Sequence, residues 1–456
     1  MHRVPTSRPA ASVAGAHAAP SRSALGVDEP PPRRVAEEPC GAVAVAPGVH
    51  WVGALDPGLR CFDLILNTGS GTTYNSFVVR GESGVAVIDT VKAEFADDFF
   101  RRLETVARYE EIRVIVLNHL EPDHTGALPE LMRRAPQAEL CISKRAPALL
   151  NALLKVSGDR VPAIRTLDTG DTIDLGGQTL QCLHTPFLHW PDTQCTWLAE
   201  AGVLFSGDIF GSHHCDERLF DDVCGEFHCA FDDYFAHIMR PFKRHVRAAL
   251  ELIEPLPIAL IAPTHGPILR ERPQVYVQRY RELATTRPIP PLDPDQPGLV
   301  ILYASAHGGT ARMAAAIRDG LEEGSGISVV LHELGCGDPR DAVDLIECAD
   351  VLVIGSPTIN GDAAKAIWDL LASLSLIDLN GKLAAAFGSY GWSGEAVRLI
   401  EERLRGLKLR VPVPGLRQKL IPNEAELVEC RAFGRALANA LNGAGAGSVI
   451  DFADLQ

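Results

Sequence analysis

The sequence predicts an α/β protein of two domains, the second of them a doubly wound parallel sheet, and three observations lead to this prediction. The chain has 456 residues, more than one hydrophobic core usually organises, and 46% of them are hydrophobic, an ordinary share for a globular protein. Short β-branched runs alternate with helical patterns along most of its length. A stretch with five prolines, residues 285–298, interrupts this alternation and is expected to link the two domains.

The first half of the chain carries short strands and helices with polar residues at the strand ends. The expected strands are 49–56, 75–81, 84–90 and 112–120. Residues 94–109 follow a helical period, and a second helix is expected to start at Thr125. This half therefore predicts αβ alternation.

The second half repeats one unit three times. Residues 299–321, 350–371 and 382–404 each run from an apolar strand through a polar loop into a helix. Three such units, with loops at the carboxyl ends of the strands, predict a doubly wound parallel sheet.

The predicted boundaries follow from composition. Residues 1–46 are rich in Ala, Pro, Ser and Arg and lack the apolar segment of a secretory signal, so we expect a disordered extension. The first domain is expected at 47–284, the second at 299–445 and a short tail at 446–456.

Charge and cysteine content exclude several classes of partner. The formal net charge is −15, and no stretch approaches the roughly 18 apolar residues of a membrane span, so we expect neither nucleic acid nor membrane as partner. The 11 cysteines are scattered, with no Cys-x-x-Cys pair. This favours a reducing cytoplasm and argues against an appended rubredoxin or zinc ribbon.

The densest chemical signal is the segment "NHLEPDHTG", which follows an expected buried strand. It brings His119, Glu121, Asp123 and His124 within six residues. Three more candidates, His189, Asp208 and His265, each follow an apolar segment. Seven clustered donors are costly to bury unless metal compensates them, and they suffice for two ions with Asp208 bridging. Isolated histidines such as His184 and His237 are not expected to bind metal, and His213 and His214 are expected to support the site or lie at the surface.

Three loops in the second half have the composition of a nucleotide site. The loop Ser305–Thr310 lies between a strand and a helix, where hydroxyls and N–H groups can surround a phosphate. "SPTINGD" (356–362) and "GSYGWSG" (388–394) follow the next two strands, and the second offers the rings of Tyr390 and Trp392 to a flavin.

The pattern His-x-Glu-x-Asp-His, followed by separate His, Asp and His, resembles the metallo-β-lactamase superfamily. The hydrolases of that superfamily typically carry a second His where Glu121 stands, and a harder carboxylate oxygen suits iron better than a zinc pair. Together with "LHWPDT", "GDIFGSH" and "THGPILR", the pattern closely resembles the flavodiiron proteins, or A-type flavoproteins, from about residue 47 to the end.

This resemblance implies a metallo-β-lactamase-like αβ/βα domain followed by a flavodoxin-like domain, with two iron ions and FMN as cofactors. One iron would be held by His119, Glu121 and His189, the other by Asp123, His124 and His265, with Asp208 as the bridge. His124 need not bind iron directly in every member. The residues expected to contact FMN are Ser305, Ala306, His307, Gly308, Gly309, Thr310, Ser356, Pro357, Thr358, Asn360, Gly361, Ser389, Tyr390, Gly391, Trp392 and Gly394. His307 departs from the family, which often carries Tyr or Trp there.

The expected function is an oxidoreductase that takes electrons through FMN and reduces O2 to water, NO to N2O, or both. Reduced FMN offers two electrons, and the two Fe(II) ions together offer two more. The total matches a four-electron reduction of O2. The resemblance implies a head-to-tail homodimer or a dimer of dimers. Because no further domain follows the second one, it also implies an external donor such as rubredoxin with its reductase.

Two alternatives remain open at this stage. The first is a dinuclear zinc hydrolase, similar to glyoxalase II or a β-lactamase, with a regulatory flavodoxin domain; Glu121 argues against it. The second is an electron-transfer module whose first domain is purely structural, against which the seven clustered donors argue.

Overall fold

The structure is a computed structural model that describes residues 41–62, 66–155, 163–285, 292–293, 295–335, 339–379 and 381–443. The predicted tail, residues 1–40 of the predicted N-terminal extension and half of the predicted linker lie outside these ranges. None of the described helices is long and apolar enough to span a lipid bilayer.

The first domain contains two sheets. The larger sheet has the strand order β1-β2-β7-β8-β9-β10-β11. Its strands are β1 (Val43–Ala46), β2 (Val49–Trp51), β7 (Phe77–Gly81), β8 (Gly84–Ile88), β9 (Ile112–Val116), β10 (Glu139–Ser143) and β11 (Ile164–Leu167). The second sheet runs in sequence order through β12 (Thr172–Asp174), β13 (Thr179–His184), β14 (Gln194–Leu198), β15 (Val203–Gly207) and β16 (Leu260–Pro263). Two short ribbons accompany them, β3 (Ala54–Asp56) with β6 (Thr72–Tyr74) and β4 (Cys61–Phe62) with β5 (Leu66–Asn67).

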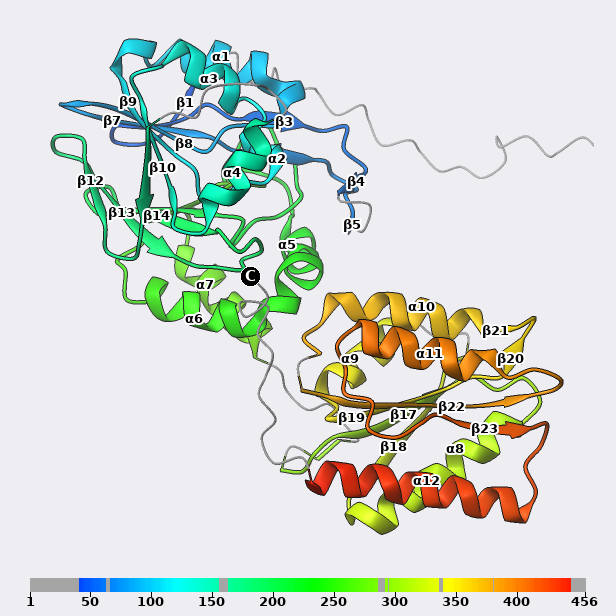
Figure 1. Cartoon of the computed structure of the whole chain (residues 1–456). Helices are drawn as coiled ribbons and strands as arrows, with labels where there is room; N and C mark the ends of the chain where they lie inside the picture. The colour runs from blue at the N-terminus through cyan, green and yellow to red at the C-terminus, as the bar shows by residue number, and fades with distance from the viewer. Residues whose placement is uncertain are drawn as a thin grey trace, which may run out of the picture. The chain divides into compact units, whose positions relative to one another are not determined.

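The two sheets face each other and helices cover their outer faces. One core lies between the sheets and joins Trp51, Phe77 and Ile88 of the larger sheet to Phe205 and Ala262 of the smaller. A second core packs the larger sheet against helices, and a third does so for the smaller sheet. The helices on the larger sheet are α1 (Ala96–Leu103), α3 (Leu128–Arg134) and α4 (Ala146–Leu154); those on the smaller are α5 (His228–Tyr234), α6 (Lys243–Ile253) and α7 (Pro273–Ala284) (Figure 1). This is the αβ/βα sandwich that the resemblance to the metallo-β-lactamase superfamily implied.

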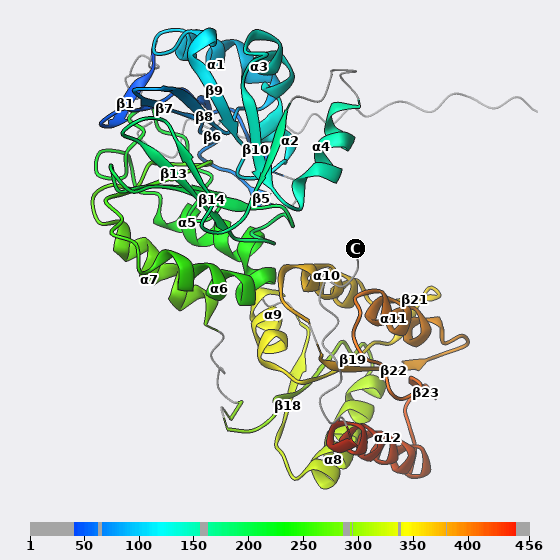
Figure 2. The same cartoon turned by 60° about the vertical axis from the view of Figure 1, so that its left-hand side comes forward.

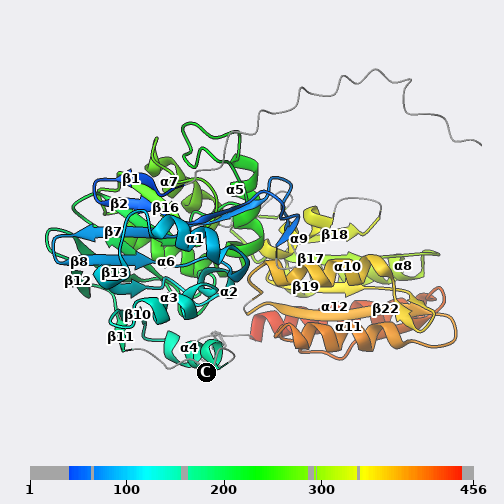
Figure 3. The same ribbon diagram turned by 90° about the horizontal axis from the view of Figure 1, so that it is seen from above.

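The second domain is a five-stranded parallel sheet. Its order is β18-β17-β19-β22-β23, the flavodoxin order 2-1-3-4-5 when the strands are counted along the chain. The strands are β17 (Leu299–Tyr303), β18 (Val329–Glu333), β19 (Val351–Gly355), β22 (Leu383–Tyr390) and β23 (Leu416–Lys419), and β17, β19 and β22 run side by side (Figure 3). Because all of them are parallel, the loops after β17, β19 and β22 meet at one edge.

Helices cover both faces of this sheet. One core joins it to α9 (Pro339–Cys348), α10 (Lys365–Ser373) and α11 (Glu395–Gly406), and the other joins it to α8 (Gly309–Ser325) and α12 (Glu424–Gly443) (Figure 2). The α/β fold class and the doubly wound second sheet are therefore confirmed.

Four details differ from the sequence prediction. Residues 43–46, expected to belong to the disordered extension 1–46, form strand β1, because they pair antiparallel with β2. A short helix, α2 (Pro122–Thr125), precedes α3, because Pro122 suits the first position of a helix. The segment after β19 forms a hairpin of β20 (Thr358–Ile359) and β21 (Asp362–Ala363) instead of an open loop. Strand β22 continues through Tyr390, so Ser389 and Tyr390 lie at a strand end.

Candidate metal centre and cofactor loops

The seven predicted metal ligands come from five places in the first domain and meet at one edge of its sheets. His119 and Glu121 lie on the loop after β9, and Asp123 and His124 lie on α2. His189 lies on the loop between β13 and β14, Asp208 directly follows β15, and His265 follows β16. Since β15 and β16 are paired in parallel, their carboxyl ends bring Asp208 and His265 to the same edge.

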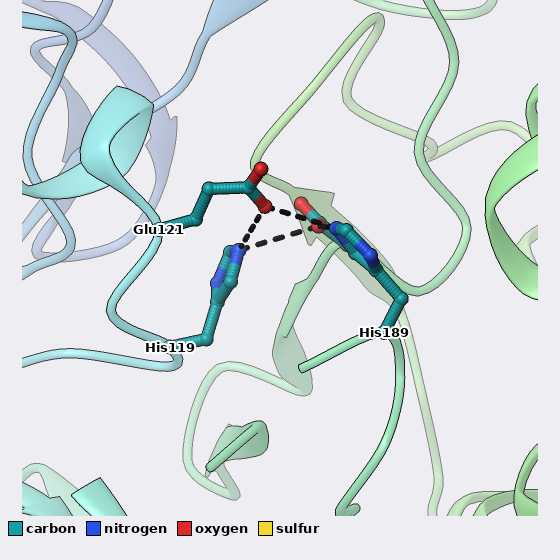
Figure 4. Close-up of side chains that lie close together, drawn as sticks. His119, Glu121 and His189 are labelled. Carbon is teal, nitrogen blue, oxygen red and sulfur yellow. Dashed lines mark hydrogen bonds and ion pairs between the residues drawn. The ribbon is translucent and has the colours of Figure 1, made fainter. Parts of the chain in front are cut away.

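One group of donors consists of His119, Glu121, His189 and Asp208. The Nε2 atom of His189 lies 2.9 Å from Glu121 Oε2, and that of His119 lies 3.5 Å from the same oxygen. The three side chains point toward one another in Figure 4. Asp208 Oδ2 completes the group, 3.2 Å from His119 Nε2 and 3.3 Å from His189 Nε2.

The second group consists of Asp123, His124 and His265, and it meets the other oxygen of Asp208. Asp123 Oδ1 lies 3.3 Å from His124 Nε2, and Asp123 Oδ2 lies 3.2 Å from His265 Nε2. Asp208 Oδ1 is 3.5 Å from His124 Nε2 and 3.9 Å from His265 Nε2. One oxygen of Asp208 thus faces each group, as a bridging carboxylate requires.

The negative charge of the buried carboxylates favours positive charge on the neighbouring groups. Burial alone would lower the pKa of His119, but Asp208 and Glu121 outweigh it and hold that pKa well above its ordinary value. The same carboxylates overcome burial at His189 and raise its pKa to about 10. Burial disfavours the charged form of Asp208, yet the neighbouring imidazoles hold its pKa well below its usual range. Without metal, protons on His119 and His189 balance the carboxylates, and a bound cation would displace them.

Buried polar atoms without hydrogen bonds show that the cluster fits metal ions. Within the described residues, both ring nitrogens of His119 and His124, both carboxylate oxygens of Asp123 and Nε2 of His265 make no hydrogen bond of acceptable geometry. Such atoms are expensive to bury unless something else binds them. Their mixture of carboxylate oxygens and imidazole nitrogens suits iron.

Neighbouring polar groups hold the donors in place. The Nδ1–H of His265 donates to the Thr73 carbonyl at 2.7 Å, which leaves Nε2 with its lone pair toward the cluster. The Thr264 hydroxyl donates to Asp208 Oδ1 at 2.6 Å. Asp89, which is buried, accepts both the backbone N–H and the side-chain amide of Asn118, each at 2.7 Å, and so anchors the loop that carries His119.

These supporting residues were missed by the sequence analysis, although the sequence contains a signal for two of them. Asp89 ends the run "GVAVID", a polar residue directly after an apolar strand, and Thr264 immediately precedes His265. His213 and His214 are both buried, so neither is a surface residue. The ring of His213 lies 4.9 Å from that of His265, and its Nδ1 contacts the Thr72 hydroxyl at 2.9 Å.

A cavity of about 400 Å³ leads to the cluster. It is lined in part by Phe62, Tyr74 and Lys92, and it reaches Glu121 and Asp123. Both carboxylates keep about 8% of their surface exposed, whereas the other donors, apart from His189, are almost fully buried. A small molecule that enters this cavity meets both groups of donors.

The predicted cofactor loops meet at the carboxyl edge of the second sheet. Ser305–Gly308 follow β17, and Gly309 and Thr310 form the first turn of α8. The hydroxyls of Thr310 and Ser389 lie 2.8 Å apart and join this loop to the end of β22. Ser356 follows β19, and its hydroxyl accepts the N–H of Ala364 at 2.9 Å.

The first loop has the form of a phosphate cradle. The backbone N–H groups of residues 306–310 make no hydrogen bond to other described residues, and such groups at a helix N-terminus attract anions. Gly308 adopts φ +79°, and a Cβ on Gly309 would stand 2.4 Å from the Leu420 carbonyl oxygen, so both positions require glycine. Trp392 is 84% exposed on a neighbouring loop, where a flavin ring could cover it.

Comparisons with known proteins agree with both halves of this description. Residues 72–266 match the family model described as ODP family beta lactamase, and residues 301–434 match that described as Flavodoxin. The chain is 58% identical to "Type A flavoprotein fprA" of Rhodobacter capsulatus, over 91% of the chain and 95% of that protein. It is 33% identical to "Flavo-diiron protein FprA2" of Clostridium acetobutylicum, over 88% of the chain and all of that protein.

Solved structures give the same result. The rubredoxin oxygen:oxidoreductase of Desulfovibrio gigas superposes with a TM-score of 0.61 at 29% identity and covers 89% of this chain and 100% of its own. The flavodiiron protein of Giardia intestinalis superposes with a TM-score of 0.60 at 29% identity, over 87% of this chain and 96% of its own.

The fold and the cluster define a flavoprotein that pairs a β-lactamase-like domain carrying a dinuclear metal centre with a flavodoxin domain. More particularly, the chain belongs to the flavodiiron family, the A-type flavoproteins. It is an oxidoreductase with FMN and a diiron site as cofactors, and nothing in these comparisons supports a zinc hydrolase.

Proposed function

We propose that this protein takes up electrons through FMN and reduces O2 to water, NO to N2O, or both, at its diiron site. The observation that carries the proposal is the Asp208 carboxylate, whose two oxygens face the two groups of donors. Relatives support both gases. An oxygen:oxidoreductase is among the structural neighbours, and a protein 32% identical, from Moorella thermoacetica, is named "Nitric oxide reductase".

In this proposal, His119, Glu121 and His189 would hold one iron, Asp123, His124 and His265 would hold the other, and Asp208 would be shared between them. When bound, the irons and FMN would supply the electrons that reduce the gas. The protein's own part is to orient the donors. Thr73 and Thr264 fix His265 and Asp208, and the cavity beside Glu121 admits a molecule the size of O2 or NO.

For the flavin, we propose that Ser305–Thr310 bind the phosphate and that the loops after β19 and β22 hold the ring system. Ser356–Gly361, except Ile359, would contact the flavin from one side. On the other side, the flavin would contact the end of β22 and the loop after it, namely Ser389–Trp392 and Gly394. The unpaired N–H groups at the start of α8 and the exposed Trp392 ring support this arrangement.

Metal content and anaerobic kinetics test the function. The purified protein should contain about two irons and one FMN per chain, and the reduced protein should be reoxidised by O2 or NO in rapid-mixing experiments. The relative rates with the two gases decide which one is the preferred substrate. Zinc in place of iron, or reduced flavin that neither gas reoxidises, would contradict the proposal.

A substitution tests the phosphate loop separately. Thr310→Asp places a carboxylate where the phosphate should lie, and like charges repel, so FMN should be lost while iron is retained. Because Thr310 is 1% exposed, Thr310→Val serves as the control for packing at this position. Undiminished flavin absorbance in purified Thr310→Asp would mean that the phosphate lies elsewhere.

We also propose a cytoplasmic location and an external electron donor, with rubredoxin and its reductase as the expected pair. The nine cysteines in the described part of the chain are all free thiols, which supports a reducing compartment. A test is reduction of the protein by purified rubredoxin and reductase with NAD(P)H, followed through the flavin absorbance. A reductase that reduces the flavin equally fast without rubredoxin would contradict this donor.

For the assembly, we propose a head-to-tail homodimer, alone or paired into a dimer of dimers, in which FMN of one chain serves the diiron site of the other. Four exposed hydrophobic side chains, Ile359, Trp392, Leu420 and Ile421, lie near the carboxyl edge of the second sheet. Exposed apolar residues gathered around a cofactor edge favour cover by a second protein surface. The five prolines between the domains would restrain one domain from folding onto the other.

Complementation tests this assembly. A chain with Asp208→Ala, which lacks iron, is combined with a chain with Thr310→Asp, which lacks FMN, and the heterodimer is purified through two different tags. Electron transfer between chains then restores one of two site pairs and about half of the wild-type activity. The control heterodimer, a wild-type chain with a doubly substituted one, should be inactive. Reversal of these two results, or a fully active monomer, would contradict the proposal.

A further inference from the structure

The ribbon of β4 and β5 carries two buried apolar residues, Phe62 and Leu66, that lie outside the hydrophobic cores. They lie opposite each other in the ribbon and are 7% and 5% exposed. Among the described residues, the cores of the first domain contain neither side chain. The ring of Phe62 lies 4.2 Å from that of His213 and 5.5 Å from that of His265, a predicted iron ligand, measured between ring centroids. The cores therefore do not account for Phe62, whereas its place beside the metal site does.

Two cavities meet this pair of residues. Phe62 lines the cavity of about 400 Å³ that reaches Glu121 and Asp123 (the metal cavity). Leu66 lines a second cavity of about 210 Å³ (the polar cavity). Most of the other residues that line the polar cavity have polar side chains: Asn67, Ser70, His213, His214, Glu226, Cys229 and Asp233. Because His213 lines the polar cavity and its ring packs on Phe62, these two rings form the wall between the cavities.

The two cavities favour different molecules. His213 is 4% exposed; its Nδ1 contacts the Thr72 hydroxyl at 2.9 Å, and its Nε2 makes no hydrogen bond to the described residues. A buried polar atom beside a polar cavity of this size calls for water as its partner. Besides its charged residues, the metal cavity has apolar walls, and such walls favour a weakly hydrated gas over water and ions. These walls are made by Leu59, Phe62, Ala93 and Pro122.

We propose that Phe62 is the residue that determines by which route molecules reach the diiron centre. Its ring keeps the water and hydrated ions of the polar cavity away from the irons, so the gas enters through the metal cavity alone. Exclusion of water strengthens the interactions of the buried charged donors. The inference rests on the proposed function, because it requires the irons to be held by the seven donors beside the metal cavity. Removal of the ring leaves a space that joins the two cavities and opens a second entrance.

Two exposed cysteines allow each cavity to be blocked separately, because Cys61 lines the metal cavity and Cys229 lines the polar cavity. Variants with Cys229→Ser or Cys61→Ser keep one of these thiols, which N-phenylmaleimide converts to a bulky thioether that survives reduction. The readout is the rate at which NO binds to the Fe(II) form of the full-length protein, followed by absorption after rapid anaerobic mixing. A label on Cys61 should abolish rapid NO binding, and a label on Cys229 should leave it unchanged. A variant with serine at both positions controls for labels on other cysteines.

Phe62→Ala should change this pattern. The label on Cys61 should no longer block NO binding, because NO then enters through the polar cavity, and labels on both cysteines should block it again. Leu66→Ala opens the wall from the other side and keeps the test decisive if Phe62→Ala does not fold. Phe220→Ala is the matched control, because Phe220 is also 7% exposed and lines neither cavity, so this variant should behave as the wild type.

Three results would overturn the role of Phe62. The first is rapid NO binding to protein that is otherwise wild type and is labelled on Cys61. The second is slow NO binding to such protein labelled on Cys229. The third is a block by the Cys61 label that persists in Phe62→Ala, or in Leu66→Ala if only that variant folds. A wild-type protein that holds no iron would instead contradict the proposed function.

Discussion

Replacement of Thr264 by valine should weaken iron binding without disturbing the fold. Thr264 is 1% exposed, and its hydroxyl donates to Asp208 Oδ1 at 2.6 Å. Its backbone N–H bonds separately to the Gly207 carbonyl at 2.9 Å and survives the substitution. Valine has nearly the same shape, so the change removes one donor from a buried carboxylate and little else.

The expected magnitude follows from the kind of bond that is lost. A hydrogen bond to a charged group contributes about 1.5–3 kcal/mol, which corresponds to a factor of roughly 10 to 150 in a binding constant. Loss of a residue that orients a metal ligand typically costs about 10- to 100-fold in metal affinity. Both estimates predict a loss of about 10- to 100-fold. The iron near Asp123 should be affected more, because the bonded Oδ1 faces His124 and His265.

The assay is anaerobic Fe(II) binding in competition with a chelator, with metal content and flavin content measured on the same sample. Thr185→Val is the matched control, since Thr185 is equally buried and its hydroxyl contacts the Cys195 thiol at 3.6 Å instead of a metal-site residue. The control should bind two irons with wild-type affinity. If Thr264→Val also binds both irons with unchanged affinity and an unchanged Tm, then Thr264 does not orient the bridging carboxylate.

Three further substitutions test other parts of the structure. Glu121→His should restore the ligand pattern of the zinc hydrolases, so iron content and gas reduction should fall while FMN stays bound; two irons and full turnover in this variant would refute the role given to Glu121. Gly309→Ala should lower the affinity for FMN, because the new Cβ would stand 2.4 Å from the Leu420 carbonyl oxygen. Gly406→Ala is the control and should leave the affinity unchanged, since a Cβ there meets no atom within 4 Å. Equal FMN affinities of the two variants would refute the effect of the close approach. Asn118→Ala leaves the buried Asp89 carboxylate short of a donor and should destabilise the metal-free protein by about 2–3 kcal/mol, seen as a fall in Tm of several degrees; a fall below one degree would refute it.

Much of the fold could be predicted from the sequence because its signals are local. An apolar run such as 299–303, followed by a Gly-rich loop and a helical period, is read within one window of residues, and three such units predict the parallel sheet. The exceptions depend on strand pairing instead. The hairpin β20–β21 depends on pairing across Asn360 and Gly361, and the extension of β22 through Tyr390 depends on pairing with β23. Pairing partners do not appear in a single window.

The candidate site, too, was predicted only in part from the sequence. The sequence alone was enough to propose seven candidate donors, since each is a His, Asp or Glu that follows an apolar segment, and Glu121 within "HLEPDH" favoured iron over zinc. Only the tertiary structure decided that one oxygen of Asp208 faces each group of donors, and that Thr264, Thr73 and the Asp89–Asn118 pair orient them. The physical reason is distance along the chain. Thr73 and His265 are 192 residues apart, and only the packing of two sheets brings them within hydrogen-bond reach.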